Sequence, residues 1–404
     1  MTPSPDARHE ARVERLAAAI NLTPPDRVPI VLGFDTSFLA QYGGVTVQAL
    51  MYSPAKTAAI LERLMAAFPE CDSIGGGTMM VTGPISDAVG QGLYKMPGRD
   101  LAPHMPFQFV EQCTMRADEY DQLIANPTEF LITTYLPRIF QAEWSRGPTR
   151  AQIAIIKGIF AHTEYTRFWS AQRARWRHEF GFPDVGGGFS KAPFDVLSDT
   201  LRGMRESCLD LYKRPGKVVQ ACEALVPYCV MYGELPSRRR RSEASPRRAL
   251  APQVGMPLHR GCVPFMSLPQ FETFYWPTLK EVMLQLIAKG LICRPFAEGD
   301  WGPNMRYWRE LPKGKVVLKL DRADLVAAKA LVGDTICLQG NVPPSLLEVG
   351  TPRQVEAYCQ RLIDGAKAGG GFIMDSAMSI TAGAKLENVN AMIKYTAKYG
   401  VYRR

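Results

Sequence analysis

The sequence TICLQGNVPPSLLEVGTPRQVEAYCQRLIDGAKAGGGFIM, residues 335–374, contains two short apolar segments on either side of a helical one. The apolar segments, Thr335–Gln339 and Gly371–Met374, are typical of buried strands. Between them, Pro352–Ala368 has apolar residues at helical spacing and begins with a proline, which predicts a helix. Two strands of one sheet that are joined through a helix run parallel to each other. This stretch therefore predicts an α/β fold built on parallel strands.

The same alternation extends outward along the chain. Further strands are predicted at Val28–Phe34, Leu291–Phe296 and Lys315–Leu320. Further helices are predicted at Pro54–Phe68, Glu281–Lys289 and Arg322–Leu331. Both a closed barrel and an open doubly wound sheet satisfy this order of elements.

The composition is that of a soluble enzyme, with 404 residues of which 46% are hydrophobic and 22% charged. No continuous apolar run is long enough to span a bilayer, and the N-terminus lacks the features of a secretory signal. The nine cysteines are scattered singly without a CxxC pair, which argues against a disulfide framework. We therefore expect a cytoplasmic protein with no membrane contact.

The formal net charge of +9 is concentrated in one place. Residues 237–252, SRRRRSEASPRRALAP, contain six arginines, and the rest of the chain is nearly balanced. A local charge run of this kind predicts a solvated basic loop rather than a nucleic-acid-binding face. Docking of an acidic partner is the functional alternative for the loop.

Residues 118–180 form a long, mostly helical stretch that is rich in aromatic residues and arginine. The stretch is too long for a single crossover between strands, so we interpret it as a helical insertion. No internal repeat is present, and residues 1–404 are expected to form a single domain.

The C-terminal third carries motifs that resemble the uroporphyrinogen decarboxylase superfamily. In order along the chain they are Gly340–Pro344, Gly350–Pro352, Gly369–Ile373 and Glu387–Asn388, with weaker likeness at Pro25–Pro29 and Ala192–Asp199. The resemblance implies a (β/α)8 TIM-type barrel with helical insertions, whose active site lies at the C-terminal ends of the strands.

Two chemistries occur in that superfamily, namely decarboxylation of a porphyrinogen and methyl transfer to or from the cobalt of a corrinoid. Its decarboxylases carry an arginine pair after the first strand and an aspartate after the second. In this sequence no arginine follows Val28 until Arg63, and glycines occupy positions 75–77. The resemblance therefore favours a corrinoid-dependent (cobalamin-dependent) methyltransferase. The alternative is a decarboxylase that acts on a porphyrinogen-like or other carboxylated ring compound.

Members of the superfamily that methylate thiols hold zinc with a His-x-Cys pair and a cysteine on the last strand. Phe296 and Glu298 occupy the matching pair of positions here, and Met378 lies near the position of the last cysteine. The usual zinc site is therefore missing. If a metal is bound, His259, Cys262 and Glu298 are its candidate ligands.

The remaining half-reaction is demethylation, in which a methyl group leaves a substrate oxygen for cobalt. The leaving oxygen needs a general acid. Glu298 and Asp300 follow a predicted strand and would share one face if the chain stayed extended. Two close carboxylates would raise the pKa of one of them, so both are predicted as catalytic.

His259 and Arg260 precede a dense aromatic segment that contains Tyr275 and Trp276. His259 is predicted as catalytic. The other three side chains are predicted to bind a flat, apolar substrate. The structural alternative is a loop whose aromatic residues pack against the barrel.

Four further residues are candidates because of their positions. Asp35 ends the first strand and is predicted as catalytic, the alternative being a helix N-cap. Asn341 and Asp375 end later strands, and His162 lies in the helical insertion; all three are predicted to bind substrate. The alternative for His162 is a purely structural histidine on a helix.

The partners implied by the resemblance are a small methyl-bearing molecule and a corrinoid. The sequence contains no D-x-H-x-x-G run of corrinoid carriers, so the corrinoid is expected on a partner protein or free in solution. Pairing of an exposed barrel face into a homodimer is a further expectation.

Overall fold

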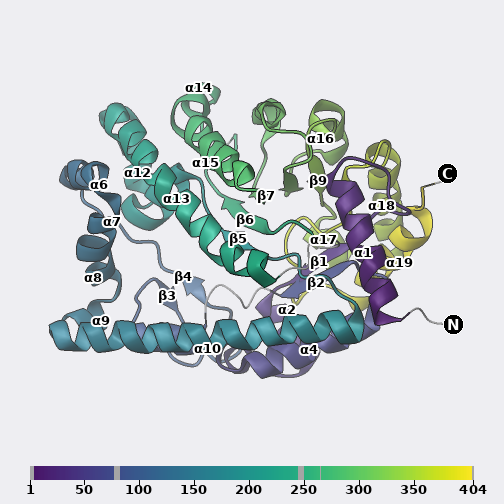
Figure 1. The fold of residues 1–404 in the computed structure, drawn as a ribbon, viewed down its shortest axis with the longest axis horizontal. Coiled ribbons are helices and arrows are strands. Elements are labelled where there is room, and N and C mark those ends of the chain that lie inside the picture. Colours follow the sequence, from purple (N-terminus) through teal and green to yellow (C-terminus); the bar gives the residue numbers. More distant parts are fainter. Residues whose placement is uncertain (1–3, 77–81, 244–249, 264, 403–404) are drawn as a thin grey trace.

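A computed structural model describes residues 4–76, 82–243, 250–263 and 265–402. Figure 1 shows strands near the middle of the molecule with helices around them. Eight strands of the described residues run parallel to their neighbours: β1 (Val31–Phe34), β2 (Ser73–Gly76), β5 (Gly188–Phe189), β6 (Gln253–Leu258), β7 (Ile292–Ala297), β8 (Val317–Leu320), β9 (Cys337–Gln339) and β10 (Phe372–Ile373). The antiparallel strands β3 (Tyr94–Lys95) and β4 (Gln108–Phe109) form a separate pair.

The parallel strands follow one another in an almost continuous order. β5 to β10 form one sheet in chain order, and β1 pairs with β2. Parallel bridges from Ile30 to Met374 and from Phe34 to Ile380 place β1 beside the β10 segment. No strand pairing joins β2 to β5 among the described residues. The predicted α/β class with parallel strands is thus confirmed.

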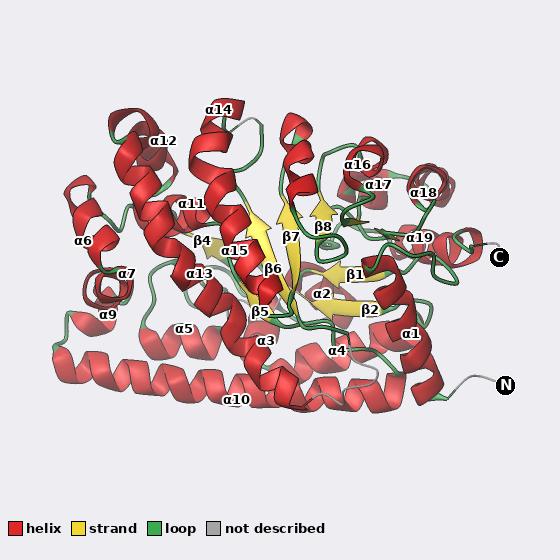
Figure 2. Cartoon of the chain, turned by 45° about the horizontal axis from the view of Figure 1, so that its top comes forward, coloured by secondary structure: helices red, strands yellow, loops and turns green. Residues whose placement is uncertain are grey.

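Helices cover the outer surface of these strands (Figure 2). Those that connect or flank the parallel strands are α1 (Pro5–Ile20), α2 (Thr36–Gly43), α3 (Val47–Tyr52), α4 (Pro54–Ala67), α5 (Gly83–Val89), α11 (Pro193–Asp195), α12 (Met204–Lys213), α13 (Pro215–Glu243), α14 (Leu268–Gln270), α15 (Trp276–Ala288), α16 (Leu325–Val332), α17 (Pro344–Val349), α18 (Pro352–Ala366) and α19 (Leu386–Tyr399). Short 3-10 or π-helical turns occur at Ala117–Glu119, Leu131–Tyr135, Val196–Arg202, Phe271–Tyr275 and Gly302–Glu310.

Local sequence explains where these elements begin. Helix α18 starts at Pro352 after a capping box, in which the side chains of Thr351 and Gln354 bond to each other's backbone amides. Its apolar face, which includes Val355 and Leu362, is buried, and the helix packs against α16, α17 and α19. The predicted strands and helices lie within a few residues of the observed ones.

Residues 118–180 are helical, as α6 (Tyr120–Ala125), α7 (Pro127–Phe130), α8 (Leu136–Ile139), α9 (Gln141–Trp144) and α10 (Pro148–Phe180). Helix α10 has 33 residues and packs against α1, α4, α5 and α9. It runs along one edge of the molecule in both views (Figures 1 and 2).

The predicted basic loop at residues 237–252 is wrong in its first half. Residues 237–243 continue helix α13, which ends at Glu243. Arginine is a strong helix former, so a run of four arginines extends a helix as readily as it forms a solvated loop. Residues 244–249, the centre of the predicted loop, lie outside the described residues.

In the part of the chain that the structure describes, no helix combines the length and apolar character needed to cross a bilayer.

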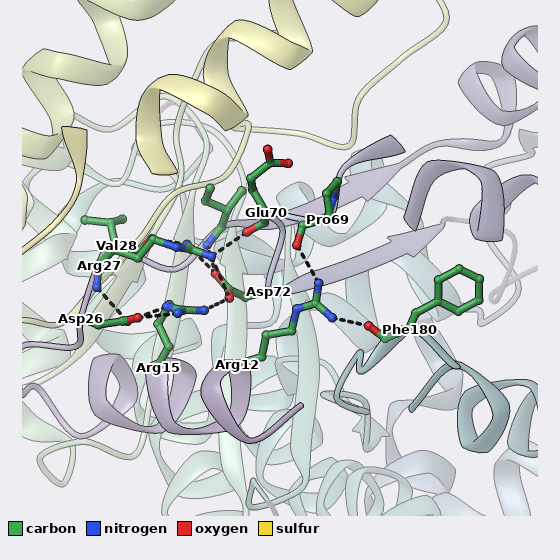
Figure 3. Close-up of polar contacts among 10 residues, drawn as sticks. Arg12, Arg15, Asp26, Arg27, Val28, Pro69, Glu70, Asp72 and Phe180 are labelled. Carbon is green, nitrogen blue, oxygen red and sulfur yellow. Dashed lines mark hydrogen bonds and ion pairs between the residues drawn. The ribbon is translucent and has the colours of Figure 1, made fainter. Parts of the chain in front are cut away.

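A buried ionic network fixes the amino ends of the first strands (Figure 3). The Asp72 carboxylate, which is fully buried ahead of β2, accepts hydrogen bonds from Arg15 of α1, from Arg27 and from the backbone amide of Ile30. Asp26 also accepts from Arg15, but 61% of the Asp26 side chain is exposed. A buried carboxylate needs such partners because desolvation of the charge is otherwise costly.

Arg12 adds a second tie from the same helix. Its guanidinium donates to the carbonyl oxygens of Phe180 at 2.7 Å and Pro69 at 2.8 Å and lies over the ring of Phe182. Figure 3 shows Arg12 between Pro69 and Phe180. Burial lowers the pKa of Arg12 to about 10. Helix α1 is therefore joined to the end of α4 and to the end of α10.

We predict that Asp72→Asn lowers the free energy of unfolding by about 3–5 kcal/mol, because Arg15 and Arg27 would keep their charges without a buried counter-charge. The matched control is Asp26→Asn, which removes another acceptor of Arg15 at an exposed position and should cost less than about 1 kcal/mol. Urea unfolding of both variants measures the difference. Equal losses in the free energy of unfolding of the two variants would show that the burial of Asp72 does not add to the stability.

Candidate active site

Polar side chains gather where three adjacent parallel strands end. Lys191 follows β5, His259 and Arg260 follow β6, and Glu298 follows β7 directly. The carboxyl ends of parallel strands meet at one edge of a sheet, so residues distant in sequence become neighbours there. The helical segment after β5 adds Asp195, which ends α11, together with Asp199 in the following π-helical turn.

Asp199 lies at the centre of this cluster. Its carboxylate is 2.6 Å from Nδ1 of His259, 2.8 Å from Nζ of Lys191 and 3.0 Å from a terminal guanidinium nitrogen of Arg260. Burial raises the pKa of Asp199, but the hydrogen bond with His259 and the charge of Lys191 outweigh burial, and the net pKa is lowered. Asp199 is therefore an ionised carboxylate that orients the side chains of His259, Lys191 and Arg260.

Asp195 holds the backbone of the same cluster. It is fully buried and accepts hydrogen bonds from the amides of His259 at 3.1 Å and Arg260 at 3.0 Å, and from the hydroxyl of Tyr275 at 2.7 Å. Burial and then the charge of Asp199 raise the pKa of Asp195. This carboxyl group fixes the turn that follows β6 and so the position of the His259 ring.

His259 is partly open to solvent, with 34% of its side chain exposed. Its Nδ1 faces Asp199, and its Nε2 lies 3.5 Å from an oxygen of Glu298. Burial lowers the pKa of His259, but the hydrogen bond and charge of Asp199 outweigh burial, and the net pKa is raised. The ring therefore keeps its proton to higher pH than free histidine and presents Nε2 on the side of Glu298.

Glu298 connects this cluster to a cavity of about 700 Å³ at the same end of the strands. The lining comes from segments after β7, β8, β9 and β10 and comprises Glu298, Asp321, Arg322, Ala323, Asp324, Asn341, Pro343, Pro344, Ser345, Tyr358, Arg361, Ala377 and Met378. A small molecule in this cavity would have Glu298 in its wall.

Of the residues predicted from sequence, the structure brings His259, Arg260, Tyr275 and Glu298 together. Tyr275 does not face a substrate pocket as predicted; it is buried and donates to Asp195. Asn341 lines the cavity, and its amide donates to two backbone carbonyls, one of them that of Asp321.

Asp375 lies just after β10. It is buried and accepts from Lys319 at 2.6 Å and Gln339 at 2.7 Å. Asp35 is the N-cap of α2, since its carboxylate accepts from the amide of Phe38. The alternative for Asp35, a helix N-cap, is therefore the observed role.

Asp300 does not share a face with Glu298, because the chain between them turns at Gly299. With a φ of +79°, Gly299 is in the left-handed region that glycine adopts at low cost. The Asp300 carboxylate is exposed and accepts from the amide of Gly302 at 2.9 Å. The extended chain that a shared face of Glu298 and Asp300 required is therefore not formed, and a catalytic role for the two carboxylates stays a prediction.

Trp276 and His162 are also placed elsewhere. Trp276 packs against Phe271, Tyr307 and Trp308, and its indole nitrogen donates to a glutamate at 3.1 Å. His162 is exposed on α10, and the arrowheads of β6, β7 and β8 point away from that helix (Figure 2). Neither belongs to the cluster around Asp199.

The side chains of His259, Cys262 and Glu298, the three candidate metal ligands, are not grouped so that they could bind one metal ion together. Among the described residues, no group of three or more His, Cys, Asp or Glu side chains could hold a metal ion. The thiol of Cys262 donates to the carbonyl oxygen of His259 at 3.7 Å, and burial raises its pKa. A protonated thiol is a poor metal ligand.

Sequence reasoning missed Asp195, Asp199 and Lys191. The two aspartates are four residues apart on a helical segment, a spacing that places both on one face. That spacing, within a segment that resembles the superfamily, is the signal that could have found them.

Comparisons with known proteins agree with this fold. A solved structure of a methyltransferase from Methanosarcina mazei matches with a TM-score of 0.63 at 15% identity, over 96% of this chain and 98% of that one. The chain therefore has the fold of that enzyme.

Sequence comparison matches part of the chain to known proteins. The family model for uroporphyrinogen decarboxylase (URO-D) matches residues 256–399, which include His259, Arg260 and Glu298. Uroporphyrinogen decarboxylases of Pseudoalteromonas atlantica and Pseudoalteromonas translucida are 36% identical over 80 residues and 34% over 76 residues. These matches cover 19% and 18% of this chain, and 22% and 21%, about a fifth, of the two relatives. The motifs of the C-terminal third that resemble this superfamily, from Gly340 to Asn388, lie within the part of the chain that the family model matches.

We predict that Asp199→Asn lowers the pKa of His259, because the substitution removes the charge that raises the pKa while the burial that lowers it remains. Titration of the imidazole by NMR measures this directly in a chain with five histidines, and His259→Gln assigns the signal. Glu298→Gln is the control: it should change the pKa less, because 42% of the Glu298 side chain is exposed. An unchanged pKa in Asp199→Asn would contradict the assigned role.

Proposed function

We propose that this protein is a corrinoid-dependent methyltransferase that removes a methyl group from an oxygen of a small molecule, and that His259 is its general acid. The observation that supports this most is the ring of His259, which is held through Nδ1 by the buried Asp199 while Nε2 lies 3.5 Å from Glu298, a residue of the cavity wall. The fold likeness to a methyltransferase supports the reaction class.

In the proposed reaction the bond between the substrate oxygen and its methyl carbon breaks. The acceptor is the reduced cobalt of a corrinoid, a second substrate that supplies the electron pair for the new bond. The leaving oxygen keeps the electrons of the broken bond and takes the proton from Nε2 of His259. Glu298 accepts the hydrogen bond of that proton before transfer and orients it toward the cavity.

Asp199 serves this step by stabilising the protonated ring, and Asp195 by holding the backbone that carries it. General-acid catalysis by a positioned side chain typically contributes about 10²- to 10⁴-fold to a rate. Arg260 is held by Asp199 at 3.0 Å and is partly buried, so in this proposal it neutralises that carboxylate rather than binding the substrate.

The rim of the cavity is suited to a broad, flat partner. Pro343, Pro344, Ala377 and Met378 give it apolar surface, and Arg322 and Arg361 can donate hydrogen bonds to the amide oxygens at the edge of a corrinoid. We propose that the corrinoid is delivered by a partner protein or from solution, and that the parallel strands close into the predicted (β/α)8 barrel. Nine free thiols accord with activity in the reducing cytoplasm.

Decarboxylation is the second candidate, because the curated relatives are named uroporphyrinogen decarboxylases. Such chemistry requires cationic side chains free to pair with substrate carboxylates. The segment after β1 leads into α2 and offers no arginine before Arg63. Release of carbon dioxide from uroporphyrinogen, with no methyl transfer, would favour this alternative.

The test supplies the enzyme with reduced free cobalamin and a panel of aryl and alkyl methyl ethers. We expect methylated corrinoid, detected by absorbance and mass spectrometry, only when an ether and the protein are both present. His259→Gln should lower kcat by about 10²- to 10⁴-fold. The control Asp334→Asn, at an exposed pair with Arg309, should be fully active. The proposal would be contradicted if no ether in the panel gave methylated corrinoid, or if a folded His259→Gln variant kept full activity.

A further inference from the structure

Helix α10 buries one of its faces in its own chain. The buried residues of α10 are Ala151, Ala154, Gly158, Trp169 and Trp176. Their spacing follows the helical repeat of 3.6 residues, so they lie along one side, which packs on α1, α4 and α5. The approach is close at Gly158, where a Cβ atom would meet Val89 of α5 at 2.5 Å.

The opposite side of α10 is also apolar, but it faces solvent. Ile153, Ile156 and Phe160 are 38%, 53% and 67% exposed, and Ile159 beside them is 60% exposed. At about 100° per residue, Ile153, Ile156 and Phe160 form a stripe roughly opposite the buried face. We call these three residues the outer stripe. A soluble helix that is apolar on two opposite sides is expected to bury both.

The charges beside the outer stripe restrict what can cover it. Lys157 and Glu164 are both exposed and are seven residues apart, two helical turns, so they lie along the same edge of the stripe. Neither forms an ion pair within the described part of the chain. A partner helix complements this edge if it presents an anion opposite Lys157 and a cation opposite Glu164.

We propose that the outer stripe binds the outer stripe of a second copy of this chain, with the two α10 helices antiparallel. Reversal of one helix places Lys157 of each copy opposite Glu164 of the other, which gives two equivalent ion pairs. The symmetry axis then passes close to Phe160, so the two Phe160 rings meet at the centre of the contact. A parallel pair would instead place the charged edges of the two helices on opposite sides of the contact, where Lys157 of one copy could not pair with Glu164 of the other.

The position of α10 leaves the cavity of each copy accessible in such a dimer. The helix lies along one edge of the molecule, and the carboxyl ends of β6, β7 and β8 point away from it (Figure 2). The cavity and His259 are at those carboxyl ends. An α10-to-α10 dimer therefore leaves both cavity mouths open to a corrinoid and its carrier.

The test is sedimentation velocity over a range of protein concentrations. We expect a concentration-dependent species of twice the 44.9 kDa mass of one chain. Phe160→Glu should abolish it, because a charge would be buried at the centre of the contact. Lys157→Glu and Glu164→Lys should each weaken dimerisation roughly tenfold, since each replaces two attractive pairs with two repulsive ones.

The decisive variant carries Lys157→Glu and Glu164→Lys in the same chain. In the antiparallel arrangement this exchange recreates both ion pairs, so the double variant should dimerise as the unmodified protein does. Circular dichroism checks that each variant is folded. A monomer at all concentrations, a dimer unaffected by Phe160→Glu, or a double variant as weak as the single ones would overturn the proposal. Loss of the dimer only when a corrinoid carrier binds to α10 would also overturn it, because the stripe would then serve that partner.

Discussion

The carboxylate of Asp72 is buried where the first two parallel strands begin, and it must be neutralised in place. Helix α1 supplies Arg15, and the segment leading into β1 supplies Arg27. Because an unpaired charge in this environment would be very costly, the geometry of the carboxylate fixes how α1, β1 and β2 meet. The arrangement of the parallel strands at their amino ends follows from that single requirement.

A second buried carboxylate, Asp199, has a comparable setting at the other end of the strands. The difference lies in its partners. Arginine holds its proton at every physiological pH, so the network around Asp72 is electrostatically fixed. Asp199 pairs with a histidine, whose charge changes near neutrality, and with Lys191 and Arg260. The same physical device therefore stabilises the fold at one end and tunes a titratable group at the other.

Much of this could be predicted from the sequence. Apolar runs and helical spacing predict the α/β alternation, because periodic burial leaves a direct trace in the residues. Glu298 could be selected because it follows a predicted strand, and His259 because it adjoins Arg260 and precedes a dense aromatic segment. Asp199 could not be predicted in this way because it lies on a helical segment after β5. Two of the residues that contact it, His259 and Arg260, follow another strand and are about 60 residues away in the sequence. Asp300 was misplaced because a left-handed turn at Gly299 breaks the assumed alternation.

Other errors have a similar origin. The capping role of Asp35 and the packing of Trp276 depend on tertiary contacts that residue type alone does not reveal. The exposure of the outer stripe of α10 could not be predicted, because a sequence does not show which of two apolar helix faces packs within its own chain and which faces solvent.

The hydrogen bond between Asp199 and His259 has a consequence for the direction of the chemistry. When the ring has given up its proton, Asp199 retains the hydrogen on Nδ1, so the neutral imidazole is confined to one tautomer. Its lone pair then points from Nε2 toward Glu298. In that state the ring is a base that can accept a proton from a hydroxyl group. The side chains that would donate the proton in the proposed reaction are therefore also arranged to take it back in the reverse direction.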